Sequence, residues 1–299
     1  MSNSTPSFSI TDTDAPARLD RYLADQLKLS RSQVRKLVEA GAITINDRSV
    51  AKPGLTLEAG DQIIVDDRLL NRSQTVLPNP DIKIPVLYAD DDLLIVDKPA
   101  GIGVHPLDPT QTTTVLNGLV AQYPQIQDVG EGKLRSGVIH RLDLDTTGTL
   151  MVALTNAGYE RGRNAITDKR HTLKRYRAIV HGKLKKESAK LARHLIIAQH
   201  QPAKVKVLSE QTPQSRLCTM SFALMRQMDD VADISIDLQT GFLHQIRAMM
   251  ANVGHPVVGD TLYGSPVANT RTLLHAQRLK FDDVDVIAPL PDEMKYATD

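Results

Sequence analysis

Apolar residues recur at helical spacing in two short runs near the start of the chain, at residues 19–27 and 34–38. This spacing predicts two helices. Ser30 stands three residues before Gln33, which is the sequence form of a capping box, so the second helix should begin directly after Ser30. Gly41 should end that helix, because glycine tolerates the left-handed backbone of a helix terminus. The short apolar segments that follow predict a small sheet packed on the helix pair.

The rest of the chain holds many short apolar strands and few helices. Glycine, proline and acidic turns separate these runs. Because the strands do not alternate regularly with helices, the pattern predicts an α+β fold on a large, mainly antiparallel mixed sheet flanked by helices. Asn156 is placed to cap a helix. The predicted strands are 86–88, 93–97, 137–142, 149–155, 175–180 and 234–238, and the predicted helices are 156–168 and 243–253.

The length of 299 residues favours a large domain with a small one over a single core. Residues 66–80 are polar, lack apolar periodicity and end in Pro-Asn-Pro, which is typical of a linker. The Ser/Thr-rich start has no basic segment followed by an apolar one, so we interpret it as a loose tail rather than a signal peptide. We expect a disordered tail at 1–14, a small domain at 15–66, a linker at 67–80 and a large domain at 81–299.

Cysteine usage and hydropathy bear on the compartment. Cys218 is the only cysteine, which excludes an intramolecular disulfide and a cysteine-based zinc site and favours a reducing compartment. The most apolar runs are far shorter than the roughly 20 residues that span a bilayer. We therefore expect a cytoplasmic monomer without a membrane segment.

The net charge of +1 argues at first against a nucleic-acid partner. Binding depends, however, on where charge lies rather than on its sum. Residues 161–193 hold twelve Lys and Arg against two acids. A solvated charged face explains such a stretch as well as a surface for RNA does.

The segment 138–148 carries the most unusual set of polar residues. His140, Arg141, Asp143 and Asp145 stand between apolar strands, where a turn would expose them at the end of a sheet. Two carboxylates can hydrolyse a glycosidic bond as an acid and base pair. Imidazole and carboxylate can hold a metal ion, and one aspartate held ionised by an arginine can act as a nucleophile or base. Equally, the two aspartates can simply cap a turn.

A second set of polar residues lies at 240–247 and 254–264. His244 and Arg247 are three residues apart and would share a face of the predicted helix. Arg247 could then reach an acid from elsewhere in the chain. Tyr176 adds an aromatic hydroxyl inside the basic stretch. Together these segments predict that an aspartate and an arginine from distant parts of the sequence meet in one cleft.

These segments closely resemble the RluA family of RNA pseudouridine synthases. Residues 140–148 read His-Arg-Leu-Asp-Leu-Asp-Thr-Thr-Gly, and residues 174–178 read Lys-Arg-Tyr-Arg-Ala. Residues 241–247 end in His-Gln-Ile-Arg, and residues 254–264 continue the family pattern as far as Tyr-Gly. The turn 98–101, Lys-Pro-Ala-Gly, also matches. Four motifs in the family's order make the resemblance specific.

The resemblance implies that uridine within RNA is isomerised to pseudouridine, with no cofactor and no metal ion. Asp143 would be the catalytic aspartate, acting by covalent attack or by removing a sugar proton. Arg247 would pair with Asp143 and keep it ionised. Tyr176 would stack on the target base and later serve as general base at carbon 5, and Arg141 would fill the gap left by the flipped-out uridine. The further RNA-binding residues in this domain would be His140, Lys174 and His244.

Residues 15–66 resemble the S4 RNA-binding domain, which often precedes this catalytic domain. The matching residues include 18–23, 30–34 and 41–46. The resemblance implies that basic side chains of the second helix contact phosphates, which position RNA without reading its sequence. These side chains are Arg31, Arg35 and Lys36.

Two positions depart from the family pattern. Phe242 stands where an arginine is usual, and Thr147 where serine is commonest. The resemblance favours large-subunit (23S) ribosomal RNA as substrate, with ribosome-assembly particles as further partners and tRNA as an alternative. A non-catalytic RNA-binding assembly factor is a competing hypothesis, and a glycosidase or metal hydrolase built on His140, Asp143 and Asp145 is another.

Overall fold

The computed structural model describes residues 6–66, 75–168, 170–266 and 271–295. The chain divides into two compact units. The first comprises Met1–Leu77 with Pro106–Thr112, and the second comprises Pro78–His105 with Thr113–Asp299. Residues 67–74 of the predicted linker lie outside the described residues.

The first unit packs two helices against small sheets. Ser30 accepts a hydrogen bond from the Gln33 backbone N–H, while the Gln33 side chain accepts one from the Ser30 backbone N–H. The predicted capping box is therefore confirmed, and the helix begins at Arg31. The elements are β1 (Ser7–Ser9), β2 (Ala17–Arg18), α1 (Leu19–Leu27), α2 (Arg31–Glu39), β3 (Ile43–Ile45), β4 (Arg48–Ser49), β5 (Thr56–Leu57) and β6 (Gln62–Val65).

Part of the segment expected to be a disordered tail is ordered. β1 pairs antiparallel with β6, so that one sheet has the order β1-β6-β3-β4. The alternation of exposed and half-buried residues in Ser7–Ser9 is too short to identify a strand from sequence. Backbone pairing with β6 supplies the order that the local pattern does not indicate.

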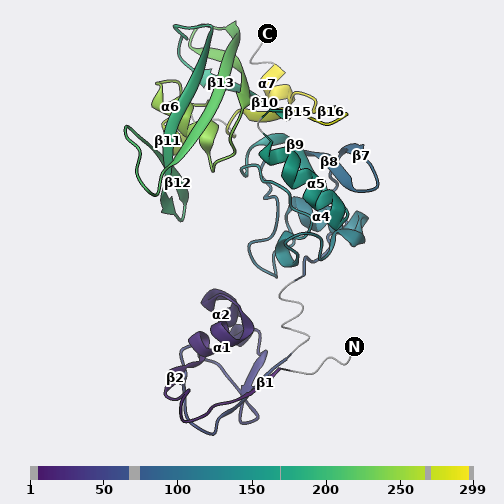
Figure 1. Ribbon diagram of the computed structural model, residues 1–299, viewed down its shortest axis with the longest axis vertical. Helices are drawn as coiled ribbons and strands as arrows, with labels where there is room; N and C mark the ends of the chain where they lie inside the picture. Colours follow the sequence, from purple (N-terminus) through teal and green to yellow (C-terminus); the bar gives the residue numbers. More distant parts are fainter. Residues whose placement is uncertain (1–5, 67–74, 169, 267–270, 296–299) are drawn as a thin grey trace. The chain divides into compact units, whose positions relative to one another are not determined.

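The second unit is built on a large mixed sheet, which confirms the predicted fold class (Figure 1). Its described strands follow the order β12-β11-β13-β14-β10-β15-β9-β8-β7, with β16 paired to β15. The pairs are antiparallel except that β15 and β9 run parallel. The strands are β7 (Val86–Ala89), β8 (Leu93–Lys98), β9 (Thr147–Ala153), β10 (Leu173–His181), β11 (Ser188–His200), β12 (Ala203–Leu208), β13 (Arg216–Gln227), β14 (Val231–Leu238), β15 (Leu274–Phe281) and β16 (Val284–Ile287).

Helices cover two parts of this sheet. α5 packs on β9 and β8, and α6 packs on β11 and β12 (Figure 1). A core cluster that includes Ile234, Ile236 and Met249 packs α6 against the strands. The helices are α4 (Val115–Gln122), α5 (Asn156–Thr167), α6 (Gln245–Asn252) and α7 (Asp292–Lys295), with short 3-10 turns η1 (Pro124–Ile126), η2 (Lys133–Arg135) and η3 (Thr261–Tyr263).

Two local predictions are wrong. The predicted strand 137–142 is a loop, in which Val138 makes a single bridge to Val152. Apolar residues there are buried by neighbouring elements rather than by ladder pairing. The cap of α5 is Thr155, whose hydroxyl accepts from the Gly158 N–H, and not Asn156.

Gly148 marks the point where β9 leaves the loop and runs beside β15. Its φ is +107°, and a Cβ built there would lie 2.2 Å from the Ala276 carbonyl oxygen. Only glycine allows both this backbone conformation and this close approach. The start of β9, directly after the loop 141–146, therefore depends on the absence of a side chain.

We expect Gly148→Ala to lower the free energy of unfolding by about 3 kcal/mol or more, because it combines backbone strain with overpacking. Urea unfolding followed by circular dichroism measures the change. Gly103→Ala is the matched control, since its Cβ would make only ordinary contacts at 3.9 Å. Equal midpoints for the two variants would contradict the expectation.

Candidate active site

Arg247 is the centre of a buried charge cluster. It lies in the first turn of α6. Its Nη1 donates to Asp143 Oδ2 at 2.9 Å, while Nε and Nη2 donate to the two carboxylate oxygens of Asp260 at 2.6 and 2.9 Å. The structure thus brings together Asp143 and Arg247, which are 104 residues apart in sequence.

The two carboxylates differ in exposure. The Asp143 side chain is 23% exposed, whereas that of Asp260 is 1% exposed. Burial alone would lower the pKa of Arg247, but its hydrogen bond to Asp260 and the charges of Asp143 and Asp260 raise that pKa overall. Arg247 therefore stays a cation, anchored by Asp260 and presenting Nη1 to the more accessible Asp143.

A buried lysine holds the loop that carries Asp143. Lys98, at the end of β8, is 0% exposed, and its Nζ donates to the carbonyl oxygens of Leu144 at 2.8 Å, Thr146 at 3.0 Å and Pro99 at 2.8 Å. Burial lowers the pKa of Lys98 to about 8, although the charges of Asp145 and Asp143 oppose this shift. The ammonium thus satisfies three carbonyls at neutral pH and fixes the turn.

His244 and Tyr263 complete the cluster around Arg247. His244 Nε2 lies 3.9 Å from Asp143 Oδ2, and its Nδ1 lies 3.1 Å from the Tyr263 hydroxyl. The Tyr263 ring centroid lies 5.2 Å from the Arg247 guanidinium carbon, within cation–π range. Burial lowers the pKa of His244, so its ring is neutral at physiological pH.

His244 is positioned by a turn rather than by the expected helix. The expected helix 243–253 begins only at Gln245, and His244 has a left-handed backbone with φ +50°. The prediction that His244 and Arg247 share a helical face is therefore wrong. The sharp turn, not the helical period, brings the imidazole to Asp143.

Tyr176 lies on β10, at the bulge between Arg175 and Tyr176 in the pairing with β15. Its ring is half-buried and packs against the core of the second unit. Burial raises the pKa of its hydroxyl, and the charge of Asp143 raises it further. The phenol is therefore protonated at neutral pH and lies within the electrostatic reach of Asp143.

Of the remaining predicted RNA contacts in this unit, Arg141 is exposed and the other two are engaged within the protein. His140 Nε2 accepts a hydrogen bond from the Met151 backbone N–H at 3.0 Å. Burial and the charges of Lys174 and Arg163 lower the pKa of His140 to about 4. Lys174 donates to the Ile166 carbonyl at 3.0 Å. His140 is thus a neutral ring that supports β9 in this structure.

In the first unit, the three predicted phosphate contacts differ in their surroundings. Arg31 Nη2 lies 2.9 Å from Oδ2 of the buried Asp20. Hydrogen bonds from Arg18 and then Arg31 lower the pKa of Asp20 to about 2. Arg35 is exposed on α2, and Lys36 Nζ lies 3.0 Å from Asp108 Oδ2.

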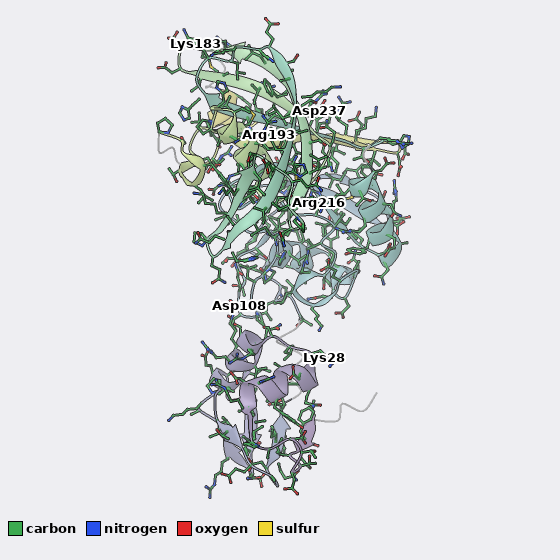
Figure 2. The ribbon with its side chains drawn as sticks, turned by 60° about the vertical axis from the view of Figure 1, so that its left-hand side comes forward. Lys28, Asp108, Lys183, Arg193, Arg216 and Asp237 are labelled. Carbon is green, nitrogen blue, oxygen red and sulfur yellow. The ribbon has the colours of Figure 1, made fainter. Side chains whose placement is uncertain are left out.

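The basic stretch 161–193 does not form one cationic face. Arg161 pairs with Asp90 at 2.9 Å, Arg175 with Asp237 at 2.6 Å, and Arg177 with the buried Asp233. Lys183 and Arg193 lie well apart on the second unit (Figure 2). Acids from distant strands neutralise these arginines, which a count along the sequence cannot anticipate. Lys169 lies outside the described residues.

Three residues of the cluster were not assigned a role by sequence reasoning. Each lies inside a segment that resembles the family pattern: Lys98 in 98–101, and Asp260 and Tyr263 in 254–264. A buried lysine that donates to carbonyls has no signature of its own in a single sequence. Asp260 could have been found as a second acid for Arg247, because an arginine fork can bind two carboxylates.

The arrangement offers one accessible carboxylate, a fixed guanidinium, a neutral imidazole and a phenol. This set can bind a polar substrate and direct Asp143 toward it. Within the described residues, no group of three or more His, Cys, Asp or Glu side chains is positioned to hold a metal ion. In the same part of the chain, no helix is long and apolar enough to cross a membrane.

Comparison with known families shows which family the chain belongs to. Residues 92–252 match the RNA pseudouridylate synthase family, and residues 17–63 match the S4 domain. An RNA pseudouridine synthase of Synechocystis sp. is 34% identical over 92% of this chain and 86% of its own length. The chain belongs to the RNA pseudouridylate synthase family.

Other relatives agree with this assignment. The ribosomal large subunit pseudouridine synthase D of Vibrio parahaemolyticus is 29% identical over 97% of this chain and 93% of its own length. The solved structure of human RNA pseudouridylate synthase domain containing 1 superposes with a TM-score of 0.58 at 22% identity, over 74% of this chain and 89% of that one. Both the family and the S4 resemblance are therefore confirmed, and the synthase is an enzyme with an RNA-binding domain.

We expect Asp260→Asn to lower kcat of the synthase by about 10²-fold with a small change in KM, because Arg247 loses the anchor that positions Asp143. Steady-state pseudouridine formation measures both constants. Asp285→Asn is the control, since Asp285 forms an exposed pair with Arg278 on β15 and β16. Wild-type kcat in Asp260→Asn would contradict the anchoring role.

The pKa of His140 predicts an acid-sensitive fold. The unfolded chain binds this proton near pH 6.5, while the folded chain binds it only near pH 4. Stability is therefore fully present above about pH 6.5 and is lost as pH falls toward 4. Between pH 7 and 5 we expect His140 to account for a loss of about 2 kcal/mol. Urea unfolding at both pH values should show a smaller loss in His140→Gln than in the wild type; equal losses would contradict the assignment.

Proposed function

We propose that this synthase converts uridine to pseudouridine in large-subunit ribosomal RNA, with Asp143 as its catalytic residue. The observation that carries the proposal is the Arg247 fork, which gives Asp143 a fixed cation at 2.9 Å and leaves that carboxylate partly exposed. The substrate rests on the relatives, of which several are named ribosomal large subunit pseudouridine synthase D. The activity belongs to the cytoplasm, where ribosomal RNA is available.

The proposed chemistry begins with the target uridine flipped out of its stack, because its reacting atoms are otherwise inaccessible. Arg141, exposed and two residues before Asp143, fills the gap in the RNA. Asp143 then either attacks the sugar or removes its proton, and both routes need the carboxylate that Arg247 pairs with. The bond from carbon 1′ to nitrogen 1 breaks, the uracil rotates, and carbon 5 bonds to carbon 1′ as Asp143 leaves or the sugar proton returns. Carbon 5 then loses its proton and nitrogen 1 gains one, which completes the isomerisation.

Tyr176 is assigned to stacking on the target uracil. Its half-buried ring at the β10 bulge suits an aromatic platform. The raised pKa of its hydroxyl disfavours the phenolate in the free enzyme. A role as general base at carbon 5 therefore requires that substrate binding change the surroundings of the phenol, whereas stacking does not.

RNA contacts outside the catalytic cluster are assigned by exposure. Arg35 and Arg141 are exposed and can meet phosphates or bases directly. Arg31 and Lys36 already pair with Asp20 and Asp108, so binding would exchange or share those partners. His140 and Lys174 hydrogen-bond to the protein backbone, so we do not assign them to RNA binding.

We expect Asp143→Asn to reduce pseudouridine formation by at least about 10³-fold, because the variant keeps the size of the side chain but loses the reactive carboxylate. Unmodified 23S rRNA transcript is the substrate, and chemical mapping of pseudouridine is the readout.

Asp145→Asn is the matched control, because Asp145 is the neighbouring turn acid without a catalytic role.

Mapping rRNA and tRNA from a deletion strain tests the choice of substrate. Unchanged activity in Asp143→Asn would contradict the mechanism, loss of a tRNA site alone would favour the tRNA alternative, and no lost site at all would favour a non-catalytic assembly factor.

A further inference from the structure

A groove lies along α6 and the edge strand β12, beside the catalytic cluster. Its larger part has a volume of about 530 Å³ and its smaller part about 290 Å³. The two parts share the lining residues Lys206, Val207 and Asn252, so they adjoin each other. In the described sheet β12 pairs with β11 on one side only. The groove therefore follows an open strand edge.

Cations line this groove. The cations are Arg193 from β11 and Lys204 and Lys206 from β12, and the imidazole of His194 on β11 also lines the groove. Both lysines are exposed, and Arg193 is held in place by bonds to Asn252 Oδ1 at 3.1 Å and to the Ala192 carbonyl at 2.9 Å. The described lining contains no Asp or Glu. The positive charge of this lining favours binding of an extended anion.

Tyr263 connects the groove to the active site. It lines the smaller part, and its hydroxyl accepts from the Val205 backbone N–H on β12 at 2.8 Å. The same hydroxyl lies 3.1 Å from His244 Nδ1, and the ring contacts the Arg247 guanidinium. Lys204 Nζ lies 6.0 Å from the ring centroid on the β12 side. One side chain thus belongs to both the catalytic cluster and the groove.

We propose that the groove binds the sugar–phosphate backbone of the RNA strand that flanks the target nucleotide. The inference rests on the proposed function and adds a second contact region to its active site. A polyanion of evenly spaced phosphates fits cations that follow one strand, and phosphate contacts hold the register of RNA on a protein. Val205 and Val207 add apolar surface to the lining, which the sugars of an RNA strand can contact.

The test is the double variant Lys204→Ala/Lys206→Ala with unmodified 23S rRNA transcript. We expect KM to rise roughly tenfold with kcat unchanged, because the lysines hold backbone and do not touch the reacting atoms. The slope of log affinity against log salt should become shallower by about 2, which corresponds to two lost phosphate contacts. Lys204→Arg/Lys206→Arg should retain wild-type KM, since it keeps the charges.

Lys83→Ala/Lys280→Ala is the matched control, because it removes two exposed lysines of the second unit that do not line the groove. Wild-type KM and salt slope in the groove variant would overturn the proposal, as would an equal rise of KM in the control. A fall in kcat alone would overturn it too, since the groove would then act only through Tyr263.

Different results would contradict the proposed groove contact and the proposed function. If the wild type makes no pseudouridine but the salt slope of RNA binding still falls in Lys204→Ala/Lys206→Ala, the function is wrong and the groove stands. If the wild type is active and the double variant is indistinguishable from it, the groove is wrong and the function stands. Competition by a poly-acidic peptide at the same affinity as RNA would overturn the assignment of the backbone.

Discussion

The shared arginine is the constraint on which the site depends. Arg247 binds Asp260 with two hydrogen bonds and Asp143 with a third, and the three residues lie on separate segments of the second unit. A buried guanidinium without its acids would be costly, because leaving a buried charge unpaired destabilises a protein strongly. The fold must therefore bring the loop 141–146, α6 and the turn before η3 to one point. The contacts that position Asp143 are therefore also contacts that stabilise the fold.

The contacts that support the loop 141–146 all involve the main chain. Lys98 donates to carbonyls on both sides of the turn, and Gly148 lets β9 pass close to β15 directly after it. His140 accepts from the β9 backbone and stays neutral to do so. Each of these residues satisfies a main-chain group or makes room for one, and together they support the loop that carries Asp143.

Charge in this protein is organised in space rather than along the chain. Arg161, Arg175 and Arg177 of the 161–193 stretch pair with acids from other segments of the second unit, so these three add little net positive charge to the surface. The groove beside α6 gathers cations from β11 and β12 without a lining acid. A near-neutral sum therefore coexists with a local surface suited to RNA, because Coulomb interactions in salt extend only about 8–10 Å.

The sequence by itself determined the family, the α+β class, the pairing of Asp143 with Arg247, and the capping box at Ser30. Such features are local patterns or ordered motifs, which can be recognised in the sequence without a structure. Tertiary structure alone decided that Asp260 anchors Arg247, that Tyr263 joins the site to β12, and that residues 137–142 form a loop. It also decided which cations are neutralised. These outcomes depend on strand order and burial, which bring together residues that no short-range period relates.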